Sequence, residues 1–185
     1  MLRLVKLSHE YRDLLDEMMT EWTASGEAII PWAIRKNDFR DFERYLRALD
    51  TTEDDGAHVP DTTYFALDED RGIFVGAANI RLRLNERLLL CGGHIGDGIR
   101  PSERGRGYGT ELVRLALVKC RERGIARVLM VCDEDNRASA RTIEKNGGML
   151  DNVIPTDDGL VRRYWIDLTN GKNGYEKDEK GDSPC

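Results

Sequence analysis

A stretch rich in glycine and arginine, at the junction of an apolar strand and an amphipathic helix, constrains this chain more than any other feature. It reads Ile-Arg-Pro-Ser-Glu-Arg-Gly-Arg-Gly-Tyr-Gly-Thr-Glu-Leu over residues 99–112. Glycine can adopt positive φ and lets a ligand approach the backbone. Amide N–H groups at the start of a helix favour an anion, and guanidinium groups suit phosphate oxygens. We therefore expect a pyrophosphate to bind the turn formed by Arg104, Gly105, Arg106, Gly107, Tyr108, Gly109 and Thr110.

Two better-known phosphate motifs do not fit this turn. A P-loop ends in Gly-Lys-Ser or Gly-Lys-Thr, and the segment Tyr108-Gly109-Thr110 supplies no lysine. A dinucleotide fingerprint needs a third Gly or Ala where Thr110 stands, in the first strand-to-helix turn of the domain. Three predicted strands already precede the turn. The alternative to phosphate binding is that the glycines serve only to form a tight turn between the strand and the helix. The alternation of three glycines with two arginines disfavours this alternative.

The periodicity of apolar residues around the turn predicts a mixed α/β sheet. The predicted elements are a strand over residues 2–7, helices over 11–22 and 39–49, strands over 62–67 and 73–84, a third strand that follows a hairpin at Asn85 and Glu86 and runs to Ile99, a helix over 108–123, a strand over 127–132, a helix over 136–146 and a final strand over 160–168. The run over 127–132 is continuously apolar, which is typical of a strand buried on both faces. A strand, a helix and a buried strand in succession imply a parallel crossover beside the antiparallel strands.

Length and composition restrict the class of protein further. The chain has 185 residues, which suits one domain. Its apolar runs are too short for a membrane helix, and charged residues interrupt the N-terminal segment, so no signal peptide is expected. The net charge of −6 argues against broad nucleic-acid binding and mildly favours a cationic or neutral small substrate. We expect a cytoplasmic protein without a nucleic-acid or membrane partner.

The cysteines and the C-terminal segment predict neither a metal site nor a disulfide framework. The four cysteines, at positions 91, 120, 132 and 185, show no metal-ligand spacing and no Cys-x-x-Cys motif. We expect the first three to be buried apolar residues and the last to be a thiol in the tail. Residues 169–185 contain Tyr175 as their only large apolar residue. The sequence therefore predicts a folded domain over residues 1–168 and a disordered tail over 169–185.

The glycine-rich turn resembles the coenzyme A signature of the GNAT N-acetyltransferases. The pattern Arg104-x-x-Gly107-x-Gly109 follows a strand that ends in Ile99-Arg-Pro, and the order of the elements agrees with that family over residues 1–168. Four segments are also similar to a bacterial branch of acetyltransferases whose substrates are generally unassigned: residues 92–96, 100–104, 139–148 and 163–166. The implied fold is α/β, with a mixed central sheet in which an antiparallel meander meets a parallel crossover strand, splayed for acyl-CoA.

The resemblance implies acetyl-CoA as the donor and assigns several residues to its binding. In this family the pantetheine arm enters the splayed gap and pairs with strand backbone, here with Gly98, Ile99 and Arg100. Asn136 stands where the family places an Asn that bonds the pantetheine or positions the acetyl group, although a helix N-cap explains it as well. The same cofactor edge carries Ser139, Arg141 and Lys145, of which a solvated helix face also explains the charged two.

Acetyl transfer to an amine needs a neutral amine, a polarised thioester carbonyl and a proton for the sulfur. The candidate bases are His94 and Asp97, which strand alternation places on opposite faces, so that only one faces the substrate. Glu27 and Glu134 are second candidates. Many family members supply the proton from a Tyr where this chain has Ile143. Water or one of three other groups must take that role here: Tyr108, Cys132 or Tyr164.

The sequence thus predicts an acetyl-CoA dependent N-acetyltransferase that acetylates a primary amine of a small molecule or peptide by direct attack in a ternary complex. A non-catalytic module that senses acyl-CoA is the alternative, and a nucleotide-binding or hydride-transfer protein is disfavoured by the motif spacing. The resemblance suggests a homodimer. The sequence selects neither the acceptor nor the length of the acyl group, although the first two helices and the closing strands are expected to form the acceptor walls.

Overall fold

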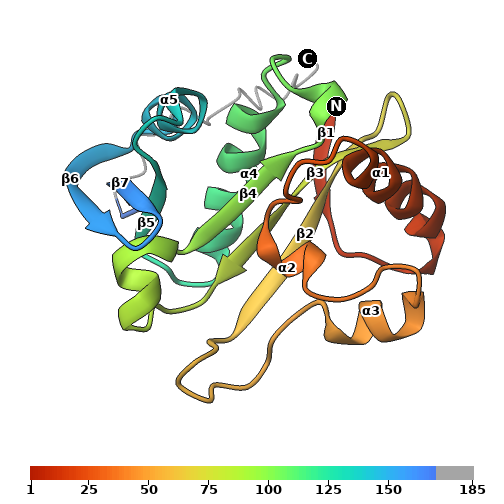
Figure 1. Cartoon of the computed structure of the whole chain (residues 1–185), viewed down its shortest axis with the longest axis horizontal. Coiled ribbons are helices and arrows are strands. Elements are labelled where there is room, and N and C mark those ends of the chain that lie inside the picture. Colours follow the sequence, from red (N-terminus) through yellow and green to blue (C-terminus); the bar gives the residue numbers. More distant parts are fainter. Residues whose placement is uncertain (170–185) are drawn as a thin grey trace, which may run out of the picture.

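The computed structural model describes residues 1–169 and shows two antiparallel sheets with helices packed around them (Figure 1). The first sheet has the order β1-β2-β3-β4, and its strands are β1 (Leu2–Val5), β2 (Asp61–Asp68), β3 (Ile73–Arg81) and β4 (Ile95–Ile99). The second has the order β5-β7-β6, with β5 (Arg127–Asp133), β6 (Met149–Thr156) and β7 (Gly159–Asp167). The predicted α/β class is confirmed.

Five α-helices and three shorter helical segments complete the described part of the chain. The α-helices are α1 (Arg12–Ala24), α2 (Trp32–Arg35), α3 (Phe42–Ala48), α4 (Tyr108–Glu122) and α5 (Arg137–Lys145). The 3₁₀ turns η1 (His9–Tyr11) and η3 (Pro101–Glu103) precede α1 and α4, and η2 (Leu88–Gly92) is a single π-helical turn. No helix among residues 1–169 is both long and apolar enough to cross a membrane.

Both faces of the first sheet are buried, because its strands alternate between two apolar cores. On β2, Phe65 and Leu67 pack with α1, α2 and α3, whereas Tyr64 and Ala66 pack with α4 and β5 on the opposite face. β5 is likewise apolar on both sides, as the continuous run in the sequence predicts. The helical layers therefore hold β4 between them and leave only its outer edge, toward β5, without a strand ladder (Figure 1).

The connection between β3 and β4 differs from the predicted hairpin. β3 ends at Arg81 rather than Leu84, and residues 82–94 form a longer connection that contains η2. The reason lies in Asn85, whose Oδ1 accepts a hydrogen bond from the N–H of Leu88 at 3.0 Å, while its Nδ2 donates to the carbonyls of Gly56 and Ala57. The side chain that suggested a hairpin turn instead starts a helical turn and fastens it to the loop before β2.

Three further details depart from the sequence-based expectations. α2 and β6 were not predicted, because α2 spans one turn and β6 is largely exposed and lacks a buried apolar face. Cys91 was expected to be buried but is exposed on η2, whereas Cys120 and Cys132 are buried as expected. The predicted disordered tail lies outside the described residues except for Thr169.

Candidate active site

The glycine-rich turn leads from η3 into α4 with two residues in the left-handed region. Gly105 has φ of +76° and Gly107 has φ of +87°, and Gly107 is the residue at the N-cap of α4. A Cβ on either residue would meet nothing within 4 Å, so the turn faces open space. No group within residues 1–169 accepts a hydrogen bond from the N–H of Gly105, Arg106 or Gly107, and the first amides of α4 lack intrahelical acceptors. The turn therefore offers a row of free amide donors to an anion.

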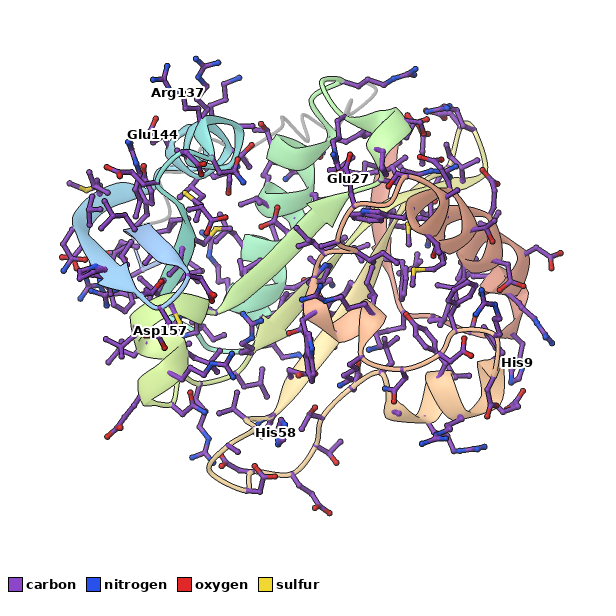
Figure 2. The ribbon with its side chains drawn as sticks, viewed as in Figure 1. His9, Glu27, His58, Arg137, Glu144 and Asp157 are labelled. Carbon is purple, nitrogen blue, oxygen red and sulfur yellow. The ribbon has the colours of Figure 1, made fainter. Side chains whose placement is uncertain are left out.

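The two arginines of the turn are partly neutralised by neighbouring carboxylates. Arg104 donates to Glu27 at 2.6 Å and to the carbonyl of Ile99 at 3.1 Å, and Figure 2 shows Glu27 beyond the end of α1, near this turn. Arg106 lies 3.7 Å from Glu103 and is largely exposed. The free amides and the α4 dipole thus give the turn a positive potential, and Arg106 is the more available guanidinium.

The outer edge of β4 presents unpaired main-chain groups toward β5. The ladder between β3 and β4 is bounded by two main-chain hydrogen bonds. At one end the N–H of Arg81 donates to the carbonyl of His94, and at the other the N–H of Arg100 donates to the carbonyl of Val75. Because hydrogen-bonded pairs alternate in an antiparallel ladder, the main-chain groups of Gly98 face β3, and those of Asp97 and Ile99 face β5. No ladder joins β4 to β5 in the described chain, so these main-chain groups of β4 are not paired with β5.

His94 closes this gap at its inner end. The main-chain N–H of His94 donates to the carbonyl of Leu129 on β5 at 2.8 Å. The Nδ1 of its imidazole accepts a hydrogen bond from the main-chain N–H of Leu129 at 2.9 Å. Burial, with a smaller effect from Arg81, lowers the pKa of His94 to about 4. Since Nδ1 accepts a hydrogen bond, the neutral ring carries its proton on Nε2. The imidazole therefore joins two strands and has no free lone pair for a substrate proton.

Asp97 lies in the middle of β4 and carries a carboxyl group without a hydrogen-bond partner among residues 1–169. Its side chain shares a face with Ile95 and Ile99, which pack in the core toward α4 and β5. Burial raises the pKa of Asp97 to about 6. On β5, burial raises the pKa of the Cys132 thiol, and the negative charge of Asp97 raises it further. A carboxylate with this pKa, beside an open strand edge, can accept a proton near neutral pH.

Gly98 and Arg100 were predicted to contact the pantetheine through their main chain, and the structure uses them for packing instead. The N–H of Arg100 bonds Val75, and its buried guanidinium binds Glu17 at 2.9 Å, the carbonyl of Phe74 at 3.1 Å and a second α1 carboxylate. A Cβ on Gly98 would lie 2.3 Å from the carbonyl oxygen of Ile30. Sequence spacing could not reveal these roles, because they depend on which edge and face of β4 each residue occupies.

The predicted residues on α5 lie at its start and along its exposed face. Asn136 is the N-cap, and its Oδ1 accepts from the N–H of Ser139 at 3.0 Å, which leaves its Nδ2 without a hydrogen-bond partner among residues 1–169. The side chain of Ser139 acts against the burial that raises the pKa of the Cys132 thiol. Lys145 is exposed in the last turn, and Figure 2 shows Glu144 and Arg137 on the outer side of this helix.

The candidate proton donors are engaged with protein groups. The hydroxyl of Tyr108 donates to Asp68 at 2.5 Å, and the buried Tyr164 donates to Glu144 at 3.2 Å. Ile143 is fully buried in the core. Of the second candidate bases, Glu27 is paired with Arg104.

Sequence analysis missed one charged residue beside β4. The guanidinium of Arg81 reaches over Gly96, where a Cβ would be 3.2 Å from its Nη2, and it lines a cavity of about 400 Å³. Nothing in the sequence indicated this role, because only the folding of residues 82–94 over the strand end places Arg81 in a cavity.

Comparison with known proteins identifies the family. Residues 1–149 match the family model of the acetyltransferase (GNAT) domain, so the chain belongs to the GNAT acetyltransferases. The expectations of an acyltransferase and of acetyl-CoA as its donor are thereby confirmed. No curated protein shows significant sequence similarity to this chain.

Solved structures share the fold at low sequence identity. MccE, the microcin C7 self-immunity acetyltransferase in complex with acetyl-CoA and AMP, superposes with a TM-score of 0.65 at 14% identity and covers 90% of this chain and 92% of its own. RimL, a ribosomal L7/L12 alpha-N-protein acetyltransferase in complex with coenzyme A, gives 0.64 at 14% identity, with 90% and 93% covered. A GNAT-family acetyltransferase from Bacillus anthracis gives 0.58 at 17% identity, with 90% and 94% covered.

Proposed function

We propose that this protein transfers the acetyl group of acetyl-CoA to a primary amine of a small molecule or peptide by direct attack in a ternary complex. The observation that carries the proposal is the unpaired edge of β4, which runs from the His94–Leu129 contact to the glycine-rich turn. An extended amide chain ending in a pyrophosphate matches both the edge and the turn. Acetyl-CoA supplies the activated thioester when it is bound.

The residues that we propose to hold the donor come from the glycine-rich turn, the edge of β4 and α5. The free amides from Gly105 to Thr110 bind the pyrophosphate, with Arg106 as an additional cation. The main-chain groups of Asp97 and Ile99 pair with the pantetheine arm. The free Nδ2 of Asn136 donates to the pantetheine arm, while its Oδ1 keeps the helix cap. Ser139 and Lys145 lie farther along α5 on the same helix.

Asp97 is our candidate for the proton acceptor. Above about pH 6 its carboxyl group is ionised, and an ammonium substrate must lose a proton before it can attack. The proton passes to the Asp97 carboxylate, directly or through one water. The departing thiolate takes its proton from water, because Tyr108 and Tyr164 donate to carboxylates. His94 acts as a positioning residue, because its two hydrogen bonds to Leu129 fix the point at which β4 and β5 separate.

A thiol-release assay over a panel of amines tests the proposal. Gly107→Glu places a carboxylate where the pyrophosphate is expected and should abolish amine-dependent thiol release. Gly124→Glu is a matched control, since Gly124 also has positive φ, meets nothing within 4 Å and lies at the other end of α4. Equal thiol release by the Gly107 variant and the wild type would overturn the assignment of the turn.

The alternative is an acyl-CoA sensor without catalytic activity. It is favoured by Ile143, which stands where many family members have a Tyr, and calorimetry separates it from the enzyme. Tight binding of acetyl-CoA with no thiol release on any amine of the panel would favour the sensor. Binding accompanied by amine-dependent release supports the transferase.

A further inference from the structure

The cavity beside β4 combines a buried cation with an apolar wall. It lies between the loop before β2, the end of β3 and η2, and its walls include Trp32, Val59, Asp61, Arg81, Arg87 and Leu88. Figure 2 shows His58, another wall residue, on the loop at the far end of β2 from the glycine-rich turn region. With a volume of about 400 Å³, the cavity has the size of a small-molecule site.

Arg81 is held rigidly at the inner end of this cavity. Its Nη1 donates to the carbonyls of Gly92 and Gly93, both at 3.0 Å. Its Nη2 lies over Gly96 of β4, the neighbour of Asp97. Because one nitrogen is fixed by two carbonyls, the remaining N–H groups of the planar guanidinium keep a defined direction and can form paired hydrogen bonds to a carboxylate.

The charge of Arg81 is not compensated by an ion pair. No carboxylate of residues 1–169 lies within ion-pair distance of its guanidinium. Asp61, which also lines the cavity, accepts a hydrogen bond from the N–H of Thr51 at 3.0 Å. Burial lowers the pKa of Arg81, the nearby charge of Asp61 acts against this effect, and the charge of Arg87 adds to it. A partly buried cation of this kind favours an anionic ligand.

The rest of the wall suits an apolar group. Trp32 is half exposed toward the cavity, and Val59 and Leu88 add aliphatic surface. Asn85 ties the loop at Gly56 to η2, so the apolar wall and the cation are held in one arrangement.

We propose that this cavity selects acceptors that carry a carboxylate next to the amine and an apolar side chain, that is, free apolar α-amino acids. The inference rests on the proposed acetyltransferase function and narrows its substrate class. The carboxylate binds Arg81 beside Gly96, and the side chain lies along Trp32 and Leu88. The local charge thus reverses the preference for cationic or neutral substrates that the net charge of −6 suggested.

Selectivity between a carboxylate and its amide tests the inference. The probes are L-leucine, L-leucinamide and spermidine, in thiol-release assays with acetyl-CoA. We expect kcat/KM for L-leucine to exceed that for L-leucinamide at least about 10-fold, since a charge-assisted pair is worth about 1.5–3 kcal/mol. Arg81→Lys should reduce this ratio by about 10-fold or more, because lysine cannot reproduce the fork. Arg83→Lys, which retains a cation beside Asp54, is the matched control and should leave the ratio unchanged.

Calorimetric titration of L-leucine into the protein saturated with coenzyme A gives a second readout that does not need turnover. Saturable binding by the wild type and its loss in Arg81→Lys support the inference. Equal or better use of L-leucinamide or spermidine, or absence of L-leucine binding, overturns it while the acetyltransferase proposal stands. Absence of thiol release with every amine tested would overturn the proposed function itself.

Discussion

Replacing Asp97 with asparagine should change stability and activity in opposite directions. Burial raises the pKa of this carboxyl from 3.8 to about 6, so the folded protein binds the proton more tightly than the unfolded chain. The free energy of unfolding therefore falls as pH rises from about 4 to about 6. A difference of about two pH units corresponds to about 3 kcal/mol of destabilisation at neutral pH, which asparagine removes.

Urea unfolding of the wild type and Asp97→Asn measures this effect. At about pH 7.5 the variant should be more stable by up to about 3 kcal/mol, and at about pH 3.5 the two proteins should be equally stable. At the higher pH, kcat/KM for amine acetylation should fall by about 10²–10⁴-fold, which is the usual contribution of a general base.

Two results would refute the reasoning about Asp97. A variant that is no more stable than the wild type at neutral pH would show that the carboxyl is well solvated or paired. A variant that is stabilised but fully active would show that Asp97 is buried for another purpose and that the base lies elsewhere. Thermal unfolding is a check, since 1 kcal/mol corresponds to about 2–4 °C in a chain of this size.

Three other perturbations test the packing around β4 and the turn. Gly98→Ala should destabilise the protein by about 1–3 kcal/mol in urea unfolding, because its Cβ would meet the carbonyl of Ile30 at 2.3 Å, and a variant as stable as the wild type would contradict this contact. Gly105→Ala meets no atom and should cost about 1–2 kcal/mol through left-handed strain alone. Arg100→Gln should lower the free energy of unfolding by about 1–3 kcal/mol, since it leaves the carbonyl of Phe74 without a donor and breaks ion pairs to partly exposed carboxylates of α1, and an unchanged midpoint would remove Arg100 as the anchor. Because the pKa of His94 is lower in the folded protein than in the unfolded chain, about 3 kcal/mol of the stability present above pH 6.5 should be lost as the pH falls toward about 4. In urea unfolding at several pH values, the stability of His94→Asn should depend less on pH than that of the wild type. An equal pH dependence would show that another group is responsible for the loss of stability.

The parts of the site that could be predicted from sequence are those whose chemistry is local. The glycine-rich turn was recognisable because positive φ, free amides and a helix start all depend on neighbouring residues. Asn136 was correctly given the N-cap that the structure shows. The succession of strand, helix and apolar strand likewise followed from periodicity alone.

The parts that could not be predicted depend on tertiary contacts. Arg100 stands beside the signature, but its guanidinium is directed to α1 by packing across the sheet. Arg81 resembles a solvent-facing strand residue until residues 82–94 fold over it. β6 escaped detection because an exposed edge strand carries no buried apolar stripe.

Initial-rate kinetics with both substrates varied test the central claim most directly. Acetyl transfer by direct attack in a ternary complex predicts double-reciprocal lines that intersect, with thiol release that depends on the amine. Parallel lines, together with an acetylated protein isolated in the absence of amine, would indicate a covalent intermediate and contradict the account.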